Sequence, residues 1–269
     1  MRDGTDAGRT ARGFKRLAAA MLTLACGLPA SAAELVQVPT RPGVTQGLFL
    51  AAESASPRWV VVLFAGDDGN VSASDHGPTR MQGNFLVRTA SYWTDHGDAC
   101  AIFDAPSDHA GGMQDVFRLS ADASTDVGAA VSELRKRYPD AKVALIGTSR
   151  GTITVGNVLE RHPELADAFV LTSPVTQANR AQAGLSGLSW KGNTARVLVL
   201  SNENDRCQFS PAGAAKQMAR ENGFDYRSIS STLGGGDRRS DCKAQSPHGF
   251  LGVETQVLDS IAGWLDNPP

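Results

Sequence analysis

The sequence predicts an α/β fold: a mainly parallel β-sheet with helices on both faces and no large cap domain. Continuous apolar runs such as Trp59–Phe64 and Ala168–Thr172 are typical of strands that are covered on both faces. These runs alternate with segments whose apolar residues recur at helical spacing, for example Val127, Val131 and Leu134. This alternation indicates parallel strands joined by crossover helices.

The chain of the predicted domain begins with an antiparallel pair of strands, at about Glu34–Val38 and Val44–Ala52, on either side of the turn residues Pro42 and Gly43. Further strands are expected at Trp59–Phe64, Ala99–Phe103, Lys142–Ile146, Ala168–Thr172, Arg196–Ser201 and Tyr226–Ser230. Helices are expected at about 85–97, 127–138, 150–161, 212–222 and 253–265. The polar, Gly-rich segment Ser173–Thr194 is too short for a large cap domain.

Residues 1–32 are predicted to be a cleaved signal peptide, so that the folded domain spans residues 33–269. A basic start is followed by the short apolar stretch Leu17–Leu28 and by Ala30-Ser31-Ala32, which fits a small-x-small cleavage site. An uncleaved anchor is the alternative. Cys26 raises the possibility of a lipoprotein, but no leucine stands three positions before it, which argues against lipid anchoring. We therefore expect a secreted or periplasmic protein.

The charge of the chain argues against nucleic acid and against an anionic membrane surface as partners. The formal net charge is −2, and cleavage after residue 32 removes five basic and two acidic side chains, which leaves −5. After the N-terminal segment, no apolar run approaches the ~20 residues that a membrane span needs. Nothing in the sequence indicates an oligomeric state.

Three cysteines remain after the predicted cleavage. Cys100 lies within an apolar run and is expected to be a buried thiol, whereas Cys207 and Cys242 lie in polar loops. In an exported protein these two are expected to form a disulfide, although two free thiols are the alternative.

The strongest functional signal is the pentapeptide Gly147-Thr148-Ser149-Arg150-Gly151, directly after the predicted strand Lys142–Ile146. A Gly-x-Ser-x-Gly match alone is weak, because an ordinary turn can carry it. A strand that runs into this motif and then into a helix resembles the nucleophile elbow of the α/β-hydrolases. The resemblance covers nearly all of residues 34–269 and is closest to small lidless members such as dienelactone-hydrolase-like and esterase-like proteins.

In α/β-hydrolases a catalytic acid and then a histidine follow the serine along the chain. Of the five histidines, His248 alone follows both Ser149 and a plausible acid, and it lies in a loop before the last predicted helix. Asp205 fits the acid because it follows the strand Arg196–Ser201, with Glu203 as the alternative. The resemblance thus implies a Ser-His-Asp triad of Ser149, His248 and Asp205.

The oxyanion hole of such a site uses two backbone N–H groups. The expected donors are Arg150, after the nucleophile, and Asp67, in the loop after Trp59–Phe64. Two departures from the family pattern stand out: Ala65-Gly66 replaces a His-Gly pair, and Arg150 would place a cation at the pocket mouth.

The loop Asp104–Met113 is expected to line the substrate pocket. A metal at Asp104, Asp108 and His109 is disfavoured because no second histidine is clustered there. No cofactor and no metal are expected.

These features predict a secreted serine hydrolase that cleaves a small-molecule carboxylic ester through an acyl-enzyme. An amidase or peptidase that uses the same triad is the first alternative, because both reactions share the tetrahedral intermediate. A non-catalytic binding protein on the same fold is the second.

Overall fold

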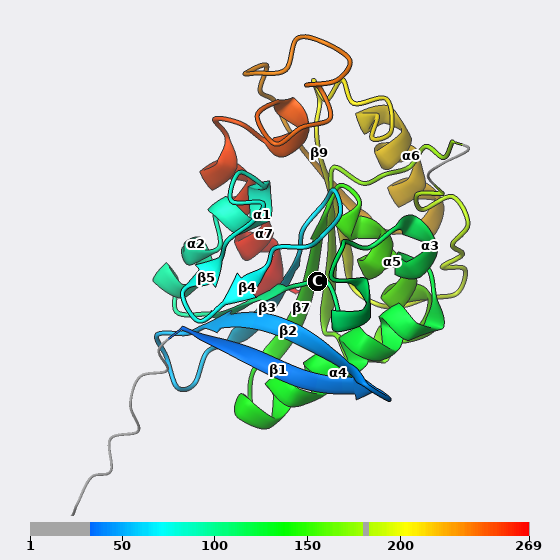
Figure 1. Cartoon of the computed structure of the whole chain (residues 1–269). Coiled ribbons are helices and arrows are strands. Elements are labelled where there is room, and N and C mark those ends of the chain that lie inside the picture. Colours follow the sequence, from blue (N-terminus) through cyan, green and yellow to red (C-terminus); the bar gives the residue numbers. More distant parts are fainter. Residues whose placement is uncertain (1–32, 180–182, 269) are drawn as a thin grey trace, which may run out of the picture.

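The computed structural model describes residues 33–179 and 183–268, which form an eight-stranded sheet between two layers of helices (Figure 1). The predicted signal peptide, residues 1–32, and Cys26 within it lie outside the described residues. Among the residues described, no helix combines the length and the apolar character that crossing a membrane requires.

The order of strands in the sheet is β1-β2-β6-β3-β7-β8-β9-β10. β1 and β2 are antiparallel to their neighbours, and all other neighbours are parallel, so the predicted fold class is confirmed. The strands are β1 (Glu34–Arg41), β2 (Val44–Ala51), β3 (Trp59–Phe64), β6 (Ala99–Phe103), β7 (Lys142–Thr148), β8 (Ala168–Thr172), β9 (Val197–Asn202) and β10 (Asp225–Ile229). A separate short hairpin pairs β4 (Ala73–Ser74) with β5 (Gly77–Pro78).

The helices divide between the two faces of the sheet (Figure 1). One face carries α1 (Phe85–Arg88), α2 (Ser91–Asp95) and α7 (Glu254–Asp266). The other carries α3 (Asp115–Arg118), α4 (Ala121–Arg137), α5 (Gly151–Arg161) and α6 (Ala212–Asn222). Three short 3-10 helices, η1 (Ser107–His109), η2 (Pro163–Leu165) and η3 (Pro247–Gly249), lie in the connections.

Each face of the sheet has its own hydrophobic core. All six residues of β3 are buried. Its even-numbered residues pack in the core beneath α4, α5 and α6, and its odd-numbered residues pack in the core beneath α1, α2 and α7. Each buried aliphatic side chain contributes about 1.5–3 kcal/mol. The continuous apolar run of β3 therefore reflects burial on two sides.

The helix predicted at about 85–97 is interrupted and forms α1 and α2 instead. The hydroxyl of Thr89, which follows α1, donates a hydrogen bond of 2.7 Å to the carbonyl of Phe85, the acceptor that a continuing helix would use. Phe85 and Trp93 remain buried in the same core, so the apolar spacing is kept although the helix is not continuous.

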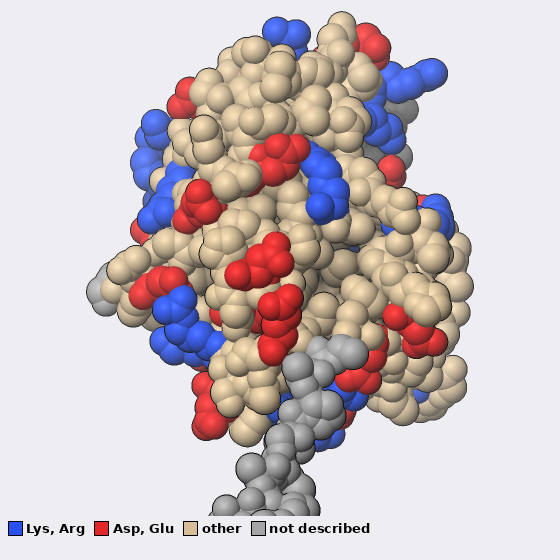
Figure 2. All heavy atoms as spheres, turned by 90° about the vertical axis from the view of Figure 1, so that its left-hand side faces the viewer, with Lys and Arg blue, Asp and Glu red and all other residues tan. Residues whose placement is uncertain are grey.

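The charged side chains on one face of the molecule are shown in Figure 2, which views the left-hand side of Figure 1. Acidic side chains are scattered over this face, and basic side chains lie among or beside them rather than in a continuous patch. Neither the acidic nor the basic side chains form a large continuous area on this face.

Candidate active site

Ser149 lies in a strained turn between the end of β7 and the start of α5. Its φ angle is 51°, in the left-handed region that residues with a side chain rarely adopt. A Cβ on Gly147 would lie 2.7 Å from the carbonyl oxygen of Gly151, and a Cβ on Gly151 would collide with the carbonyl group of Phe64. The turn therefore leaves room for glycine alone on both sides of Ser149.

His248 approaches Ser149 from the loop between β10 and α7. Its Nε2 lies 2.9 Å from the Oγ of Ser149, and its Nδ1 lies 2.8 Å from the Oδ2 of Asp205. His248 is 4 % exposed, and the side chain of Asp205 is fully buried. Glu203, the alternative acid, instead accepts a hydrogen bond of 2.8 Å from the hydroxyl of Ser228 at the surface. The structure thus brings together the three residues selected from the sequence.

Buried hydrogen bonds fix the backbone around this cluster. The hydroxyl of Ser173, directly after β8, donates to the carbonyl of His248 at 2.8 Å. Ser173 is fully buried and has a φ angle of 43°, so a second strained residue supports the histidine loop. The N–H of Cys207 donates to the Oδ1 of Asp205 at 2.8 Å. Both oxygens of that carboxylate are therefore engaged, which holds it in one orientation.

A disulfide joins Cys207 to Cys242, the pair suggested by the sequence, while Cys100 is a free buried cysteine. Burial raises the pKa of the Cys100 thiol, which keeps it protonated and unreactive. The disulfide lies two residues after Asp205 and six residues before His248. It therefore links the loop of the acid to the loop of the histidine.

The turn Gly66–Gly69 follows β3 and passes beside Ser149. The N–H of Gly69 donates to the carbonyl of Gly66 at 2.9 Å, and Asp67 between them has a φ angle of 45°. A Cβ on Gly66 would lie 2.9 Å from the Cβ of Ser149. Within residues 33–179 and 183–268, the N–H groups of Asp67 and Arg150 have no hydrogen-bond acceptor. Both are the donors expected for an oxyanion hole.

The carboxylates of this turn are paired with cations. The Oδ2 of Asp67 lies 3.4 Å from the Nζ of Lys243, and the Oδ2 of Asp68 lies 3.0 Å from a guanidinium nitrogen of Arg80. These contacts pair two negative charges with cations. They reduce the repulsion that the carboxylates would exert on a negative charge beside the turn.

The Arg150 side chain does not present a free cation at the pocket mouth, which corrects the sequence-based expectation. Its Nε donates to the Oδ1 of Asp115 at 2.7 Å. The side chains of Arg150 and Asp115 are 14 % and 4 % exposed, so the pair is largely buried and the charge is compensated. Asp115 lies on the four-residue helix α3, which is too short to be recognised by periodicity.

Ser149 lies between two neighbouring cavities. The larger one has a volume of about 330 Å³ and is lined by Met81, Asn84, Phe85 and His248 among others. The smaller one, about 190 Å³, is lined by residues that include Arg150, Val175 and Phe209. Asp67 and Lys243 border both.

The loop Asp104–Met113 contributes no lining residue to either cavity, so its predicted role in the pocket is wrong. The Asp104 carboxylate instead accepts hydrogen bonds from the N–H groups of Val71 and Ala73, each at 2.8 Å. These bonds tie the loop after β6 to the segment that follows the turn Gly66–Gly69.

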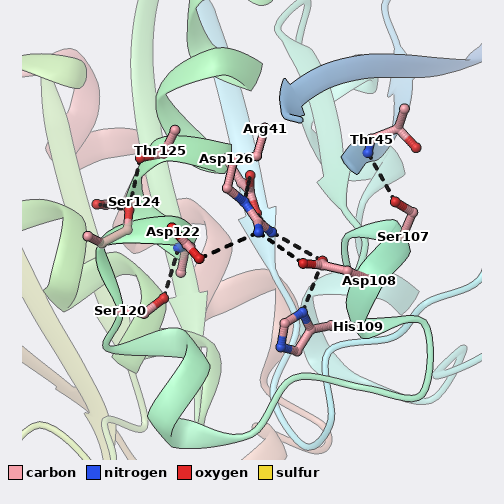
Figure 3. A network of polar contacts seen from close by, with 12 residues as sticks. Arg41, Thr45, Ser107, Asp108, His109, Ser120, Asp122, Ser124, Thr125 and Asp126 are labelled. Carbon is pink, nitrogen blue, oxygen red and sulfur yellow. Dashed lines mark hydrogen bonds and ion pairs between the residues drawn. The ribbon is translucent and has the colours of Figure 1, made fainter. Parts of the chain in front are cut away.

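Asp108 and His109 belong to a polar network around Arg41 (Figure 3). The Arg41 guanidinium is bonded to Asp108 at 2.9 Å and to Asp126 at 2.8 Å, and Asp122 lies 3.5 Å away. The Nδ1 of His109 lies 3.0 Å from Asp108. The guanidinium bridges carboxylates of two elements, so the cluster joins β1 to η1 and α4 as a structural network.

The fold and the serine turn define the class of protein: an α/β-hydrolase, with Ser149 in the turn that follows a central parallel strand. The sequence profile of the family described as serine aminopeptidase, S33 matches residues 84–219, just over half of the chain. The chain therefore belongs to this family of α/β-hydrolases. None of the curated proteins matches the sequence.

Solved structures support the same fold. An α/β serine hydrolase homologue from Coxiella burnetii has a TM-score of 0.60 at 12 % identity, over 87 % of this chain and 97 % of its own. A lidless α/β serine hydrolase from Xanthomonas campestris has a TM-score of 0.58 at 13 % identity, over 89 % and 98 %. Esterase 2 of Thermogutta terrifontis has a TM-score of 0.58 at 12 % identity, over the same shares. At these identities the likeness shows the fold alone.

Proposed function

We propose that the protein is an exported serine hydrolase that cleaves carboxylic esters through Ser149, His248 and Asp205. The observation that carries the proposal is the unbroken set of contacts from the Oδ2 of Asp205 through the imidazole to the Oγ of Ser149, at 2.8 and 2.9 Å. A serine hydroxyl is a weak nucleophile, and this arrangement supplies both the base that activates it and the carboxylate that orients the base.

In the proposed reaction, the Nε2 of His248 takes the proton of Ser149 as the Oγ attacks the ester carbonyl carbon. The carbonyl π electrons move to oxygen, and the free N–H groups of Asp67 and Arg150 are suited to bind the resulting oxyanion. When the intermediate collapses, the bond to the alcohol oxygen breaks and His248 returns the proton to it. Water, deprotonated by the same imidazole, then releases the acid and restores Ser149.

The cavities beside Ser149 favour a small, neutral ester. The larger cavity has a volume of about 330 Å³, and the apolar side chains of Met81 and Phe85 line it. The cations that border the site, Arg150 and Lys243, are each paired with an aspartate. An uncompensated charge that would select an ionic substrate is therefore not among the described lining residues.

An aminopeptidase is the second candidate, because the matching family is described as serine aminopeptidase. Such an enzyme needs a carboxylate to bind the ammonium group of its substrate. Among the described residues that line the two cavities, Asp67 is the single acidic one, and it lies 3.4 Å from the Nζ of Lys243. This pairing favours the ester.

Export is supported by the sequence of residues 1–32 and by the disulfide between Cys207 and Cys242. Disulfides persist in oxidising compartments such as the periplasm or the extracellular space. Mass spectrometry of the protein secreted by its native host tests this part of the proposal: a mature N-terminus at residue 33 or 34 is expected, and an intact N-terminus contradicts it.

The reaction is tested with a nitrophenyl ester and a nitroanilide that carry the same acyl group, in a series of graded chain length. We expect hydrolysis of the short-chain esters by the wild type, much slower hydrolysis of the anilides, and loss of both in Ser149→Ala. Faster cleavage of aminoacyl anilides would favour the aminopeptidase. A folded protein that cleaves neither would favour a binding protein.

A further inference from the structure

Arg118, at the end of α3, carries a buried positive charge that the reaction described above does not use. The residue is fully buried, and within the described part of the chain it forms no salt bridge. One guanidinium nitrogen donates to the hydroxyl of Thr154 at 3.1 Å, and the other donates to the carbonyl of Asp67 at 3.3 Å. Its Nε has no hydrogen-bond partner among the residues that the structure describes. Burying a charge in this way costs stability, so its position calls for a functional explanation.

The guanidinium lies directly against the turn that passes beside the nucleophile. A Cβ on Gly69 would collide with a terminal nitrogen of Arg118, and it would lie 2.6 Å from the methyl carbon of Met113. At the other end of the same turn, Gly66 faces Ser149. The turn Gly66–Gly69 is therefore held between the nucleophile and Arg118.

The bond from Arg118 holds the peptide unit that follows Asp67, a residue in a strained conformation. Asp67 has a φ angle of 45°, its carbonyl accepts from Arg118, and its own N–H is free of any acceptor within the described residues. The N–H of Asp67 shares its peptide unit with the carbonyl of Gly66, which accepts from the N–H of Gly69 at 2.9 Å. With Arg118 holding the next peptide unit, both units that flank the Cα of Asp67 are fixed, and this restricts the direction in which the N–H points. An oxyanion-hole N–H stabilises the transition state only if it points to the position where the negative charge develops on the carbonyl oxygen.

The charges near Arg118 add a favourable field. Arg150 is paired with Asp115. The two carboxylates of the turn that also act on Arg118, those of Asp67 and Asp68, are paired with Lys243 and Arg80, so Arg118 is the cation of this described group that has no carboxylate partner. Burial, followed by the repulsion from Arg150, lowers the pKa of Arg118 to about 9, so the guanidinium remains protonated at neutral pH. A buried cation behind the turn stabilises negative charge on its far side more strongly than an exposed cation would.

We propose that Arg118 is a positioning residue for the oxyanion hole: its guanidinium holds the Asp67 carbonyl so that the Asp67 N–H points toward the ester oxygen in the transition state. The inference rests on the proposed ester hydrolysis at Ser149. It adds a residue that touches neither the substrate nor the reacting atoms and acts through the backbone of Asp67.

The test compares Arg118→Met and Arg118→Lys with the wild type, by steady-state hydrolysis of a short-chain nitrophenyl ester. Arg196→Met is the matched control. Arg196 is another arginine with an unpartnered Nε, and it donates to the backbone carbonyls of Leu265 and Asn267 at 3.0 and 3.1 Å. Arg196 lies directly before the start of β9, whereas Ser149 directly follows the end of β7. Because these strands are parallel, the two residues lie at opposite ends of the strands.

We expect kcat of Arg118→Met to fall about 10- to 100-fold with KM within about 3-fold, since removing an entire oxyanion donor costs roughly 10²–10³ in kcat. Arg118→Lys keeps the charge but not the planar fork, and its kcat should fall at least about 5-fold. Arg196→Met should lose thermal stability but keep kcat within about 2-fold. All assays are run well below the unfolding temperature of each variant.

If Arg118→Met keeps the wild-type kcat, Arg118 has no positioning role, but the proposed ester hydrolysis is unaffected. If Arg118→Met does not fold, a wild-type kcat in Arg118→Lys leads to the same conclusion. If Arg196→Met loses as much kcat as Arg118→Met, the loss reflects general destabilisation, and the positioning role of Arg118 is overturned as well. If the wild type shows no hydrolysis that depends on Ser149, the proposed function fails, and the inference fails with it.

Discussion

Replacing Cys207 and Cys242 together by serine is expected to lower the free energy of unfolding by about 4 kcal/mol. The disulfide closes a loop with a sequence separation of 35. For a loop of this length, the restriction of the unfolded chain amounts to about 13 cal/mol/K, which corresponds to about 4 kcal/mol at 25 °C. In a domain of this size, each kcal/mol shifts the unfolding temperature by about 2–4 °C, so the midpoint should fall by roughly 8–15 °C.

The same substitution should also slow ester hydrolysis, because the disulfide joins the loops of Asp205 and His248. The N–H of Cys207 donates to the Asp205 carboxylate at 2.8 Å, so a looser loop after β9 would misdirect the acid. We expect kcat to fall several-fold at a temperature where the variant is folded. Urea denaturation followed by circular dichroism, and nitrophenyl ester kinetics, measure the two effects on one preparation.

Two controls separate the disulfide from its side chains. Wild-type protein reduced with dithiothreitol should lose as much stability as the double variant, although it keeps both sulfur atoms. Cys100→Ala removes the free buried thiol and leaves the disulfide, so it should lose less. If the double variant unfolds within 1 kcal/mol of the wild type and keeps its full kcat, the disulfide neither stabilises the fold nor holds the site together.

Three further perturbations test other parts of the structure. Asp205→Asn keeps the shape of the acid but removes its charge, and should lower kcat by roughly 10³- to 10⁴-fold; a loss below tenfold would exclude Asp205 as the orienting acid. Gly69→Ala should cost about 1–3 kcal/mol, because its φ angle of 69° is strained for alanine and the new Cβ meets Arg118. The control is Gly213→Ala in α6, where the added Cβ would have no atom within 4 Å, so urea denaturation should show no loss of stability. The Arg41 guanidinium lowers the pKa of Asp108, so this carboxylate contributes stability above its unfolded pKa of about 3.9, and the contribution is lost as pH falls through the lower folded value. Arg41→Met should therefore flatten the change in stability between pH 7 and pH 3, and an unchanged pH profile would contradict this coupling.

Local patterns in the sequence predicted most of the fold. Each apolar run assigned to a parallel strand corresponds to a strand, since burial on both faces requires apolar residues at consecutive positions. Two helices differ from the expectation: α4 begins at Ala121 rather than at about 127, and the helix assigned to about 85–97 is interrupted. Its apolar spacing is real, but the hydroxyl of Thr89 bonds to the carbonyl of Phe85, and the N–H groups of Ala90 and Tyr92 bond to carbonyls three residues back, which interrupts the α-helix. A local hydrogen bond of this kind is invisible to periodicity.

The residues that meet at Ser149 could be selected because each has a chain position that the fold class prescribes. His248 and Asp205 follow strands whose carboxyl ends share one edge of the sheet, so their loops converge. Asp115 and Arg118 offered no comparable signal. They lie on a four-residue helix, and their partners Arg150 and Asp67 come from loops distant in the chain. Contacts of this kind depend on tertiary packing, which no pattern along the sequence encodes.

Reaction of the protein with a fluorophosphonate, followed by peptide mass spectrometry, tests the central claim most directly. The geometry in which Ser149 lies 2.9 Å from the Nε2 of His248 predicts a single stoichiometric adduct on Ser149, and no adduct in a folded Ser149→Ala variant. A folded wild-type protein that forms no adduct, or that carries the adduct on another residue, would contradict the assignment of Ser149 as the nucleophile.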